Sequence, residues 1–149
     1  MTRGQHVQLD FHSSLDMLDV VQVVSDHIGK MAGLDEESLH WVGVAVRESV
    51  INAIRHGNAN DARKRVHVQF TTLNGADAPG LEIRVRDEGP GFDPQCLPNC
   101  LAPENLLKAS GRGIFLIRSF MDELVLQRAP QGGMEVFMVK RVHPTANPV

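Results

Sequence analysis

The chain has 149 residues, of which 42% are hydrophobic and 22% are charged, enough for one sizeable core with little room for a second. A formal net charge of −3 gives no general attraction to nucleic acid, and no apolar run approaches the about 18 residues of a membrane span. We therefore expect a single cytoplasmic domain over residues 1–142, with a frayed tail at 143–149 and with neither nucleic acid nor a membrane as partner.

The first elements follow from hydrophobic periodicity. Residues 6–11 alternate apolar and polar side chains, which predicts a strand, and residues 15–31 have the period of an amphipathic helix ended by Gly29 or Gly33. Four apolar residues of this helix are expected to face inward: Leu15, Leu18, Val21 and Ile28. Its outer face, with Asp16, Asp19, Asp26 and His27, is either a docking face or simply a solvated one.

A second, long helix is predicted to open with the acidic turn at 35–37 and to close at Gly57. Glu48, Asn52 and His56 are spaced four apart and so line one stripe of that helix. Apolar residues flank the stripe, with Val42, Val46, Val50 and Ala53 on one side and Val44 and Ile51 on the other. We therefore expect the three polar side chains to face a cavity.

Glu48 and Asn52 suit a particular chemistry. A carboxylate can take a proton from an attacking hydroxyl, and an amide oxygen is a hard neutral ligand suited to magnesium. The alternative is structural, with Glu48 paired to Arg47 or Arg55. His56 is equally well explained as a cation at the negative end of the helix dipole.

A hairpin follows, with strands at 66–70 and 81–86 around a loop at 74–80. The second strand runs directly into Asp87, Gly89 and Gly91. A carboxylate at a strand end can accept a hydrogen bond from an exocyclic amine, and glycines let a ligand approach the backbone. This segment indicates a pocket for a flat heterocycle such as adenine, although the same pattern also suits an ordinary turn.

A glycine-flanked turn at Gly111, Arg112 and Gly113 leads into an apolar helix. The free N–H groups and partial positive charge of a helix start form a phosphate site, to which Arg112 would add a mobile cation. The turn matches neither the P-loop nor the dinucleotide fingerprint, and it is also compatible with a plain helix cap. Strands at 124–128 and 134–140, joined by 129–133, complete an α/β (α+β) two-layer sandwich with helices on one face of a mixed, mainly antiparallel sheet.

Three motifs occur in the order of the N, G1 and G2 boxes of the GHKL ATPases. They are Glu48-x-x-x-Asn52-x-x-x-His56, then Asp87-x-Gly89-x-Gly91, then Gly111-x-Gly113. Within that superfamily, residues 47–58 and 111–122 resemble the signatures of the small bacterial serine-protein kinase/anti-sigma factors. The resemblance covers nearly the whole chain and implies the histidine-kinase-like ATPase fold.

The resemblance implies a role for each of these positions. Glu48 is the expected catalytic base, Asn52 the magnesium ligand and Asp87 the partner of the adenine amino group. Gly89 and Gly91 are expected to shape the nucleotide loop, and the segment from Gly111 to Gly113 to lie against the phosphates. His56 and Arg112 complete the expected ATP-binding set.

The resemblance also implies a function with ATP and Mg²⁺ as cofactors. The protein is expected to phosphorylate a serine or threonine of an anti-sigma-factor antagonist and to act as a homodimer. The unphosphorylated antagonist would bind the protein and free a sigma factor. The main alternative is a nucleotide-gated binding regulator without kinase activity or with a partner other than a sigma factor. A detached sensor-kinase domain is disfavoured, because it needs a helical hairpin upstream of Leu15.

Two further features follow from the same comparison. Residues 93–110, which include Cys96 and Cys100, are expected to form the ATP lid, with both thiols free. The family often carries a Gly-Thr pair whose hydroxyl helps to bind the purine, and the corresponding position here is Gly133-Met134. Water or Glu135 could compensate for the missing hydroxyl.

Overall fold

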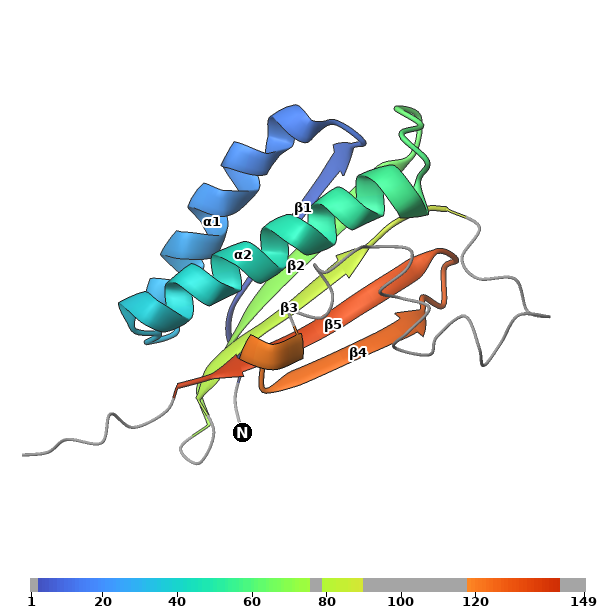
Figure 1. Cartoon of the computed structure of the whole chain (residues 1–149). Helices are drawn as coiled ribbons and strands as arrows, with labels where there is room; N and C mark the ends of the chain where they lie inside the picture. Colours follow the sequence, from blue (N-terminus) through green and yellow to red (C-terminus); the bar gives the residue numbers. More distant parts are fainter. Residues whose placement is uncertain (1–2, 76–78, 90–117, 143–149) are drawn as a thin grey trace, which may run out of the picture.

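The computed structural model describes residues 3–75, 79–89 and 118–142. Most of these residues form one β-sheet and the helices that pack on it. The five-stranded sheet has the order β1-β2-β3-β5-β4 (Figure 1). Its strands are β1 (Arg3–His12), β2 (Arg65–Leu73), β3 (Gly80–Arg86), β4 (Glu123–Arg128) and β5 (Met134–Arg141). Each predicted strand is confirmed, and each observed strand is one to four residues longer than the range predicted from the sequence.

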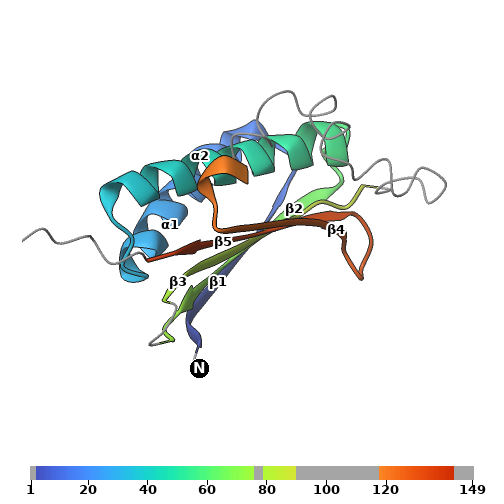
Figure 2. The same ribbon diagram turned by 60° about the horizontal axis from the view of Figure 1, so that its bottom comes forward.

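The helices lie on one face of the sheet, as Figure 2 shows with the sheet nearly edge-on. They are α1 (Leu18–Met31), preceded by the 3₁₀ helix η1 (Leu15–Met17), and α2 (Glu36–Asn52), followed by the π-helix η2 (Ala53–Gly57). The two-layer sandwich is therefore confirmed. One detail differs, because all the pairings among the described strands are antiparallel and the expected mixed character is not seen.

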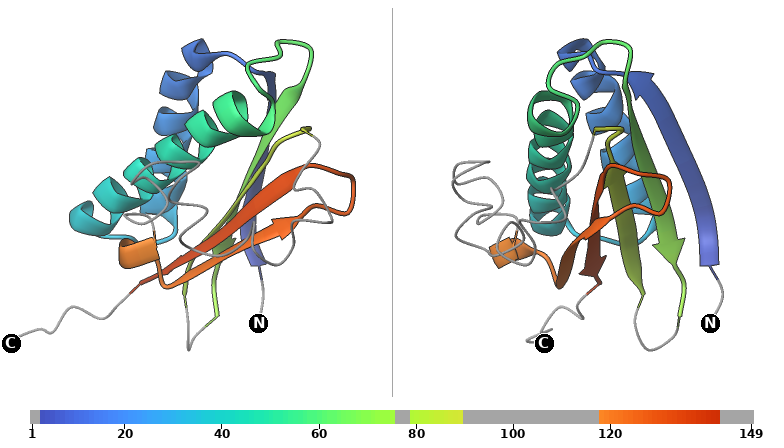
Figure 3. Two further views of the ribbon diagram at one scale, coloured as in Figure 1. Left: turned by 45° about the vertical axis from the view of Figure 1, so that its right-hand side comes forward. Right: turned by 90° about the vertical axis from the view of Figure 1, so that its right-hand side faces the viewer.

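The core lies between the two layers. Antiparallel pairing sets Val68 opposite Val85 and Phe70 opposite Ile83, and alternation points all four side chains at the helices. These residues are at most 1% exposed. Burying each such side chain contributes about 1.5–3 kcal/mol. The other sheet face carries mostly polar residues, and no helix in the described part of the chain covers it (Figure 3).

Helix α1 packs as the periodicity predicts, except at its start. Leu18, Val21 and Ile28 are buried, but Leu15 is 41% exposed, so its predicted inward position is wrong. Leu15 stands in η1, three residues past the end of the edge strand β1, where the sheet offers no further surface to cover it.

The end of α1 is a Schellman motif. Leu34 N–H donates to the Gly29 carbonyl at 3.1 Å, and Gly33 N–H donates to the Lys30 carbonyl at 3.0 Å. Gly33 has a φ of +95°, which a side chain would strain. Of the two predicted helix ends, Gly33 is the one used, while Gly29 lies inside the helix.

Helices α1 and α2 approach closely at two glycines. Gly29 faces the side chain of Leu39, and the Gln22 side chain donates from Nε2 to the Gly43 carbonyl at 3.0 Å. This contact fixes α2 along the sheet. Within the described residues, no helix is both long enough and apolar enough to cross a bilayer.

Candidate active site

Helix α2 begins where the acidic turn predicts. The Asp35 side chain caps it by accepting from the Ser38 N–H at 2.8 Å, and acidic residues in the first turn suit the positive end of the dipole. Of the two apolar flanks of the stripe, one is buried and the other is partly buried. The buried flank is Val42, Val46, Val50 and Ala53, and the partly buried one is Val44 and Ile51.

Glu48 and Asn52 lie together on the stripe between these flanks, and both are half-buried. Within the described residues, Glu48 forms no ion pair, so the structural alternative of a pair with Arg47 or Arg55 is not realised. The amide nitrogen of Asn52 is buried and has no hydrogen-bond partner among the residues that the structure describes. An unpaired buried amide is costly, which is the pattern expected where a ligand completes the hydrogen bonds.

The stripe does not continue to His56. After Asn52 the helix widens into η2, in which Asn58 N–H donates to the Ala53 carbonyl at 2.8 Å, five residues back. A residue four positions on is therefore no longer directly below Asn52, and the His56 side chain is exposed. The structure brings Glu48 and Asn52 together and leaves His56 at the helix end, so its nucleotide contact stays a prediction.

Asp87 follows the last residue of β3 and is only 5% exposed. Its Oδ1 accepts two backbone hydrogen bonds, from Gly89 N–H at 3.0 Å and Met134 N–H at 3.1 Å. Its Oδ2 accepts no hydrogen bond within the described part of the chain. Burial raises the pKa of the Asp87 carboxyl, and the two backbone bonds partly oppose that rise. One oxygen is thus held by the protein and the other is available to a donor.

Three glycines enclose this carboxylate. A Cβ on Gly57 would overlap the Asp87 side chain, and a Cβ on Gly89 would overlap the Gly57 carbonyl. Gly133, with a φ of +82°, lies against the Asp87 backbone and side chain. Gly89 is therefore a position where only a glycine fits, while its expected part in the nucleotide loop stays a prediction. Gly57 was expected only as a helix end, and Gly133 only as part of a departure from the family pattern.

Asn58 is a buried residue that sequence reasoning missed. Its Nδ2 donates to Ser13 Oγ at 2.9 Å and to the Arg65 carbonyl at 3.0 Å, while its Oδ1 accepts from Glu88 N–H at 2.8 Å. It thereby ties the end of the helix to the residue after Asp87. An asparagine after a helix-ending glycine is an ordinary turn residue, so no local signal distinguishes it.

Glu88 turns away from this enclosure. Its Oε1 accepts from Arg65 N–H at 2.8 Å, and its Oε2 lies 2.8 Å from His67 Nε2. These bonds, the Arg65 one first, lower the pKa of the Glu88 carboxyl. Glu88 is held by Arg65 and His67 and does not face the three glycines. Of the two neighbouring carboxylates, Asp87 is therefore the one on the side of the glycines.

The structure corrects one expectation about Glu135. Its Oε2 accepts from Arg84 at 3.0 Å and from the Gln127 side chain at 2.7 Å, on the sheet face opposite the helices. It therefore cannot replace the hydroxyl missing at Met134. Met134 contributes its backbone instead, because its carbonyl also accepts from the Asp87 N–H at 3.0 Å.

The remaining predicted site residues lie outside the described residues. They are Gly91, Gly111, Arg112 and Gly113, together with the predicted lid at 93–110 and its Cys96 and Cys100. Their roles stay predictions.

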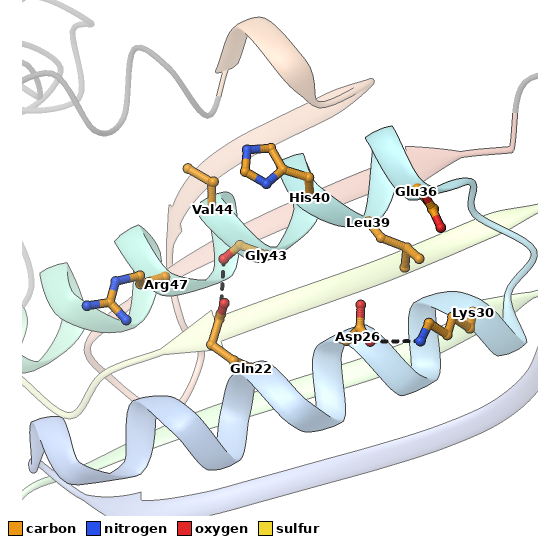
Figure 4. Close-up of a pocket in the computed structure, with 9 residues that line it drawn as sticks. All are labelled: Gln22, Asp26, Lys30, Glu36, Leu39, His40, Gly43, Val44 and Arg47. Atoms are coloured by element: carbon orange, nitrogen blue, oxygen red, sulfur yellow. Dashed lines mark hydrogen bonds and ion pairs between the residues drawn. The ribbon is translucent and has the colours of Figure 1, made fainter.

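A groove of about 560 Å³ runs between α1 and α2 (Figure 4), and its lining includes neither Glu48 nor Asn52. It mixes charges of both signs, since Glu36 and Arg47 line it together with the Asp26–Lys30 ion pair at 3.1 Å. A polyanion such as a triphosphate would meet carboxylates along it. The groove is therefore a poor nucleotide site, and the enclosure around Asp87 is the better one.

A comparison with protein families matches residues 11–140 to the histidine kinase-like ATPase domain. The chain belongs to this family. The resemblance that the three motifs indicate is thereby confirmed, and membership in this ATPase family supports ATP as the nucleotide.

The chain is also similar over most of its length to named proteins of Staphylococcus and Oceanobacillus. It is 23% identical over 144 residues to "Serine-protein kinase RsbW" of Staphylococcus epidermidis, covering 92% of this chain and 87% of that protein. It is 24% identical over 148 residues to the Staphylococcus aureus protein of the same name, covering 95% and 89%. It is 29% identical over 108 residues to "Anti-sigma F factor" of Oceanobacillus iheyensis, covering 71% of each chain.

Proposed function

We propose that this protein is an ATP-dependent serine/threonine-protein kinase and anti-sigma factor of a partner-switching system. The observation that carries the proposal is the unpaired polar face of Glu48 and Asn52, on a helix whose end at Gly57 packs against Asp87. The names of the relatives, a serine-protein kinase and an anti-sigma factor, support the same function.

Asp87 would bind the adenine end of ATP, and Asn52 and Glu48 would bind its triphosphate end. The Oδ2 of Asp87 would accept a hydrogen bond from the adenine amino group, while the close backbone contacts of Gly57 and Gly89 hold the carboxylate in place. Asn52 and Glu48 lie successively further from Gly57 along the helix, so the triphosphate would run toward Glu48. In this direction the γ-phosphate would lie beside the expected base.

Asn52 fits a magnesium ion, because its amide oxygen is a hard neutral ligand and no other group in residues 3–75, 79–89 and 118–142 holds its amide nitrogen. When bound, the ion would neutralise charge on the phosphates. Glu48 would accept the proton of the target hydroxyl as that oxygen bonds to the γ-phosphorus and ADP leaves with the bridging oxygen.

The proposed partners are an anti-sigma-factor antagonist, which receives the phosphate, and a sigma factor, which is released when the unphosphorylated antagonist binds. We also propose that the protein acts as a homodimer, which sedimentation analysis at several protein concentrations would test. A single monomeric species at all concentrations would contradict the dimer and leave the kinase proposal intact.

The kinase proposal is tested by incubating the protein with γ-labelled ATP and its antagonist protein. We expect label on a serine or threonine of the antagonist, lost in Glu48→Ala although calorimetry still detects ATP binding. Glu37→Ala is the matched control, since Glu37 is an exposed acid in the first turn of the same helix. Nucleotide-dependent antagonist binding without any label would favour the alternative of a nucleotide-gated regulator.

A further inference from the structure

The only tryptophan of the chain lies on the helix face that carries Glu48 and Asn52. Trp41, Ala45, Glu48 and Asn52 are spaced four, three and four residues apart, which sets them on one face of α2. Ala45 is buried and small, and Trp41 is the first aromatic side chain beyond Glu48 on this face. It is half-buried and therefore presents part of its surface.

Trp41 stacks on Phe120, with ring centroids 3.6 Å apart and an angle of 6° between the ring planes. Phe120 ends the short helical segment at 118–120 that lies beside α2 in Figure 1. It is firmly held, because its carbonyl accepts from Lys140 Nζ at 2.9 Å and the next residue, Met121, is buried in the core. The two rings form a fixed aromatic surface.

The geometry of the proposed reaction predicts the side from which the acceptor approaches, and this aromatic surface lies on that side. Attacking and leaving oxygens are roughly in line in phosphoryl transfer. If adenine is bound at Asp87 and the γ-phosphate lies by Glu48, the acceptor hydroxyl must approach from the side away from Asp87. On α2 that side is the half toward the N-terminus, which carries Trp41.

We propose that the stacked rings of Trp41 and Phe120 bind the acceptor segment and determine its specificity. Trp41 lies seven residues from Glu48, or about 10 Å along the helix axis. An extended chain covers about 3.3 Å per residue, so the contact falls about three residues from the phosphorylated serine or threonine. An apolar side chain at that position of the partner would pack on the rings, as aromatic anchors do in interfaces.

The inference rests on the proposed function, so labelling of the antagonist by the wild-type protein is measured first. Trp41→Ala is then expected to raise the KM for the antagonist by about tenfold, as truncation of an aromatic anchor does. The KM for ATP and kcat should stay within about twofold of wild type, because Trp41 is proposed to touch the partner only. Trp41→Phe keeps an aromatic ring against Phe120 and should restore most of the affinity.

The matched control is Phe137→Ala. Phe137 is a half-buried aromatic residue on the opposite sheet face, where Arg84 lies 4.6 Å from its ring centroid. Its truncation should lower stability while leaving the KM for the antagonist unchanged. This control separates a general loss of stability from loss of the acceptor contact.

The outcomes distinguish the two proposals. Absence of label with the wild-type protein would overturn the kinase and the acceptor surface together. Labelling by wild type with an unchanged antagonist KM in Trp41→Ala would overturn the acceptor surface alone. An equal rise in the KM for ATP, or no recovery in Trp41→Phe, would show that the ring stack only stabilises the fold. Either result would overturn the inference as well.

Discussion

The carboxylate of Asp87 lies directly against the backbone of Gly57, so that a Cβ on Gly57 would overlap three atoms of the Asp87 side chain. This contact joins the end of the Glu48 helix to the turn that follows β3. It thereby joins Asp87, the expected adenine contact, to the helix that carries Glu48 and Asn52.

Gly57→Ala should therefore displace the Asp87 carboxylate. We expect a loss of about 1–3 kcal/mol in unfolding free energy from the steric overlap, and a fall of about tenfold or more in ATP affinity from the misplaced acceptor. Denaturant unfolding and calorimetry with ATP measure the two effects. Gly43→Ala on the same helix is the control, because its Cβ would meet only the flexible end of Gln22 at 3.4 Å.

Asp87→Asn should separate folding from nucleotide recognition. The asparagine oxygen can still accept from Gly89 and Met134, so the turn is kept, but an NH₂ group replaces the free Oδ2. A donor would then face the adenine amino group, and we expect ATP affinity to fall about 10- to 100-fold. Unchanged calorimetric affinity in a folded variant would show that Asp87 is not the adenine partner.

The same variant gives a pH dependence of known sign. Burial raises the pKa of Asp87 above its ordinary value of 3.8, so the folded state binds this proton more tightly than the unfolded state. The contribution of this proton to the free energy of unfolding is fully present below pH 3.8 and is lost as the pH rises through the folded pKa of Asp87. Relative to Asp87→Asn, wild type should therefore lose stability with rising pH. Urea unfolding of both proteins across this range tests the trend, which an opposite slope would contradict.

Asn58→Ala should loosen the turn that holds Asp87 in place. The change removes three hydrogen bonds and leaves the Glu88 N–H without its acceptor, at an expected cost of about 2–4 kcal/mol. ATP affinity should fall as well, although Asn58 is not expected to touch the nucleotide. Gln69→Ala removes a half-buried amide whose Nε2 donates to Gln8 Oε1 at 3.1 Å, and should change stability by under about 1 kcal/mol.

Much of the site could be predicted because its signals are local. Asp35 and the acidic first turn mark the start of α2, and helical spacing alone sets Glu48 and Asn52 on one face. Alternation along β3 likewise sets Asp87 at the strand end. In each case the information lies in residues a few positions apart, over which backbone geometry is nearly constant.

The prediction for His56 relied on the same regularity beyond the point where it holds. The π-helical turn at 53–57 interrupts the spacing of four, and nothing in the residues themselves marks it. Leu15 was misplaced for a related reason, because its burial depends on where the sheet ends and not on the helical period.

By itself, the sequence determined the order of strands and helices, the three motifs and hence the ATPase family. The tertiary structure alone decided that Gly57 and Gly133 enclose Asp87, that Asn58 holds the turn and that Trp41 stacks on Phe120. These contacts join residues far apart in the chain, and their geometry depends on how the helices and strands pack. Local propensity sets each element's type, whereas packing sets which side chains meet.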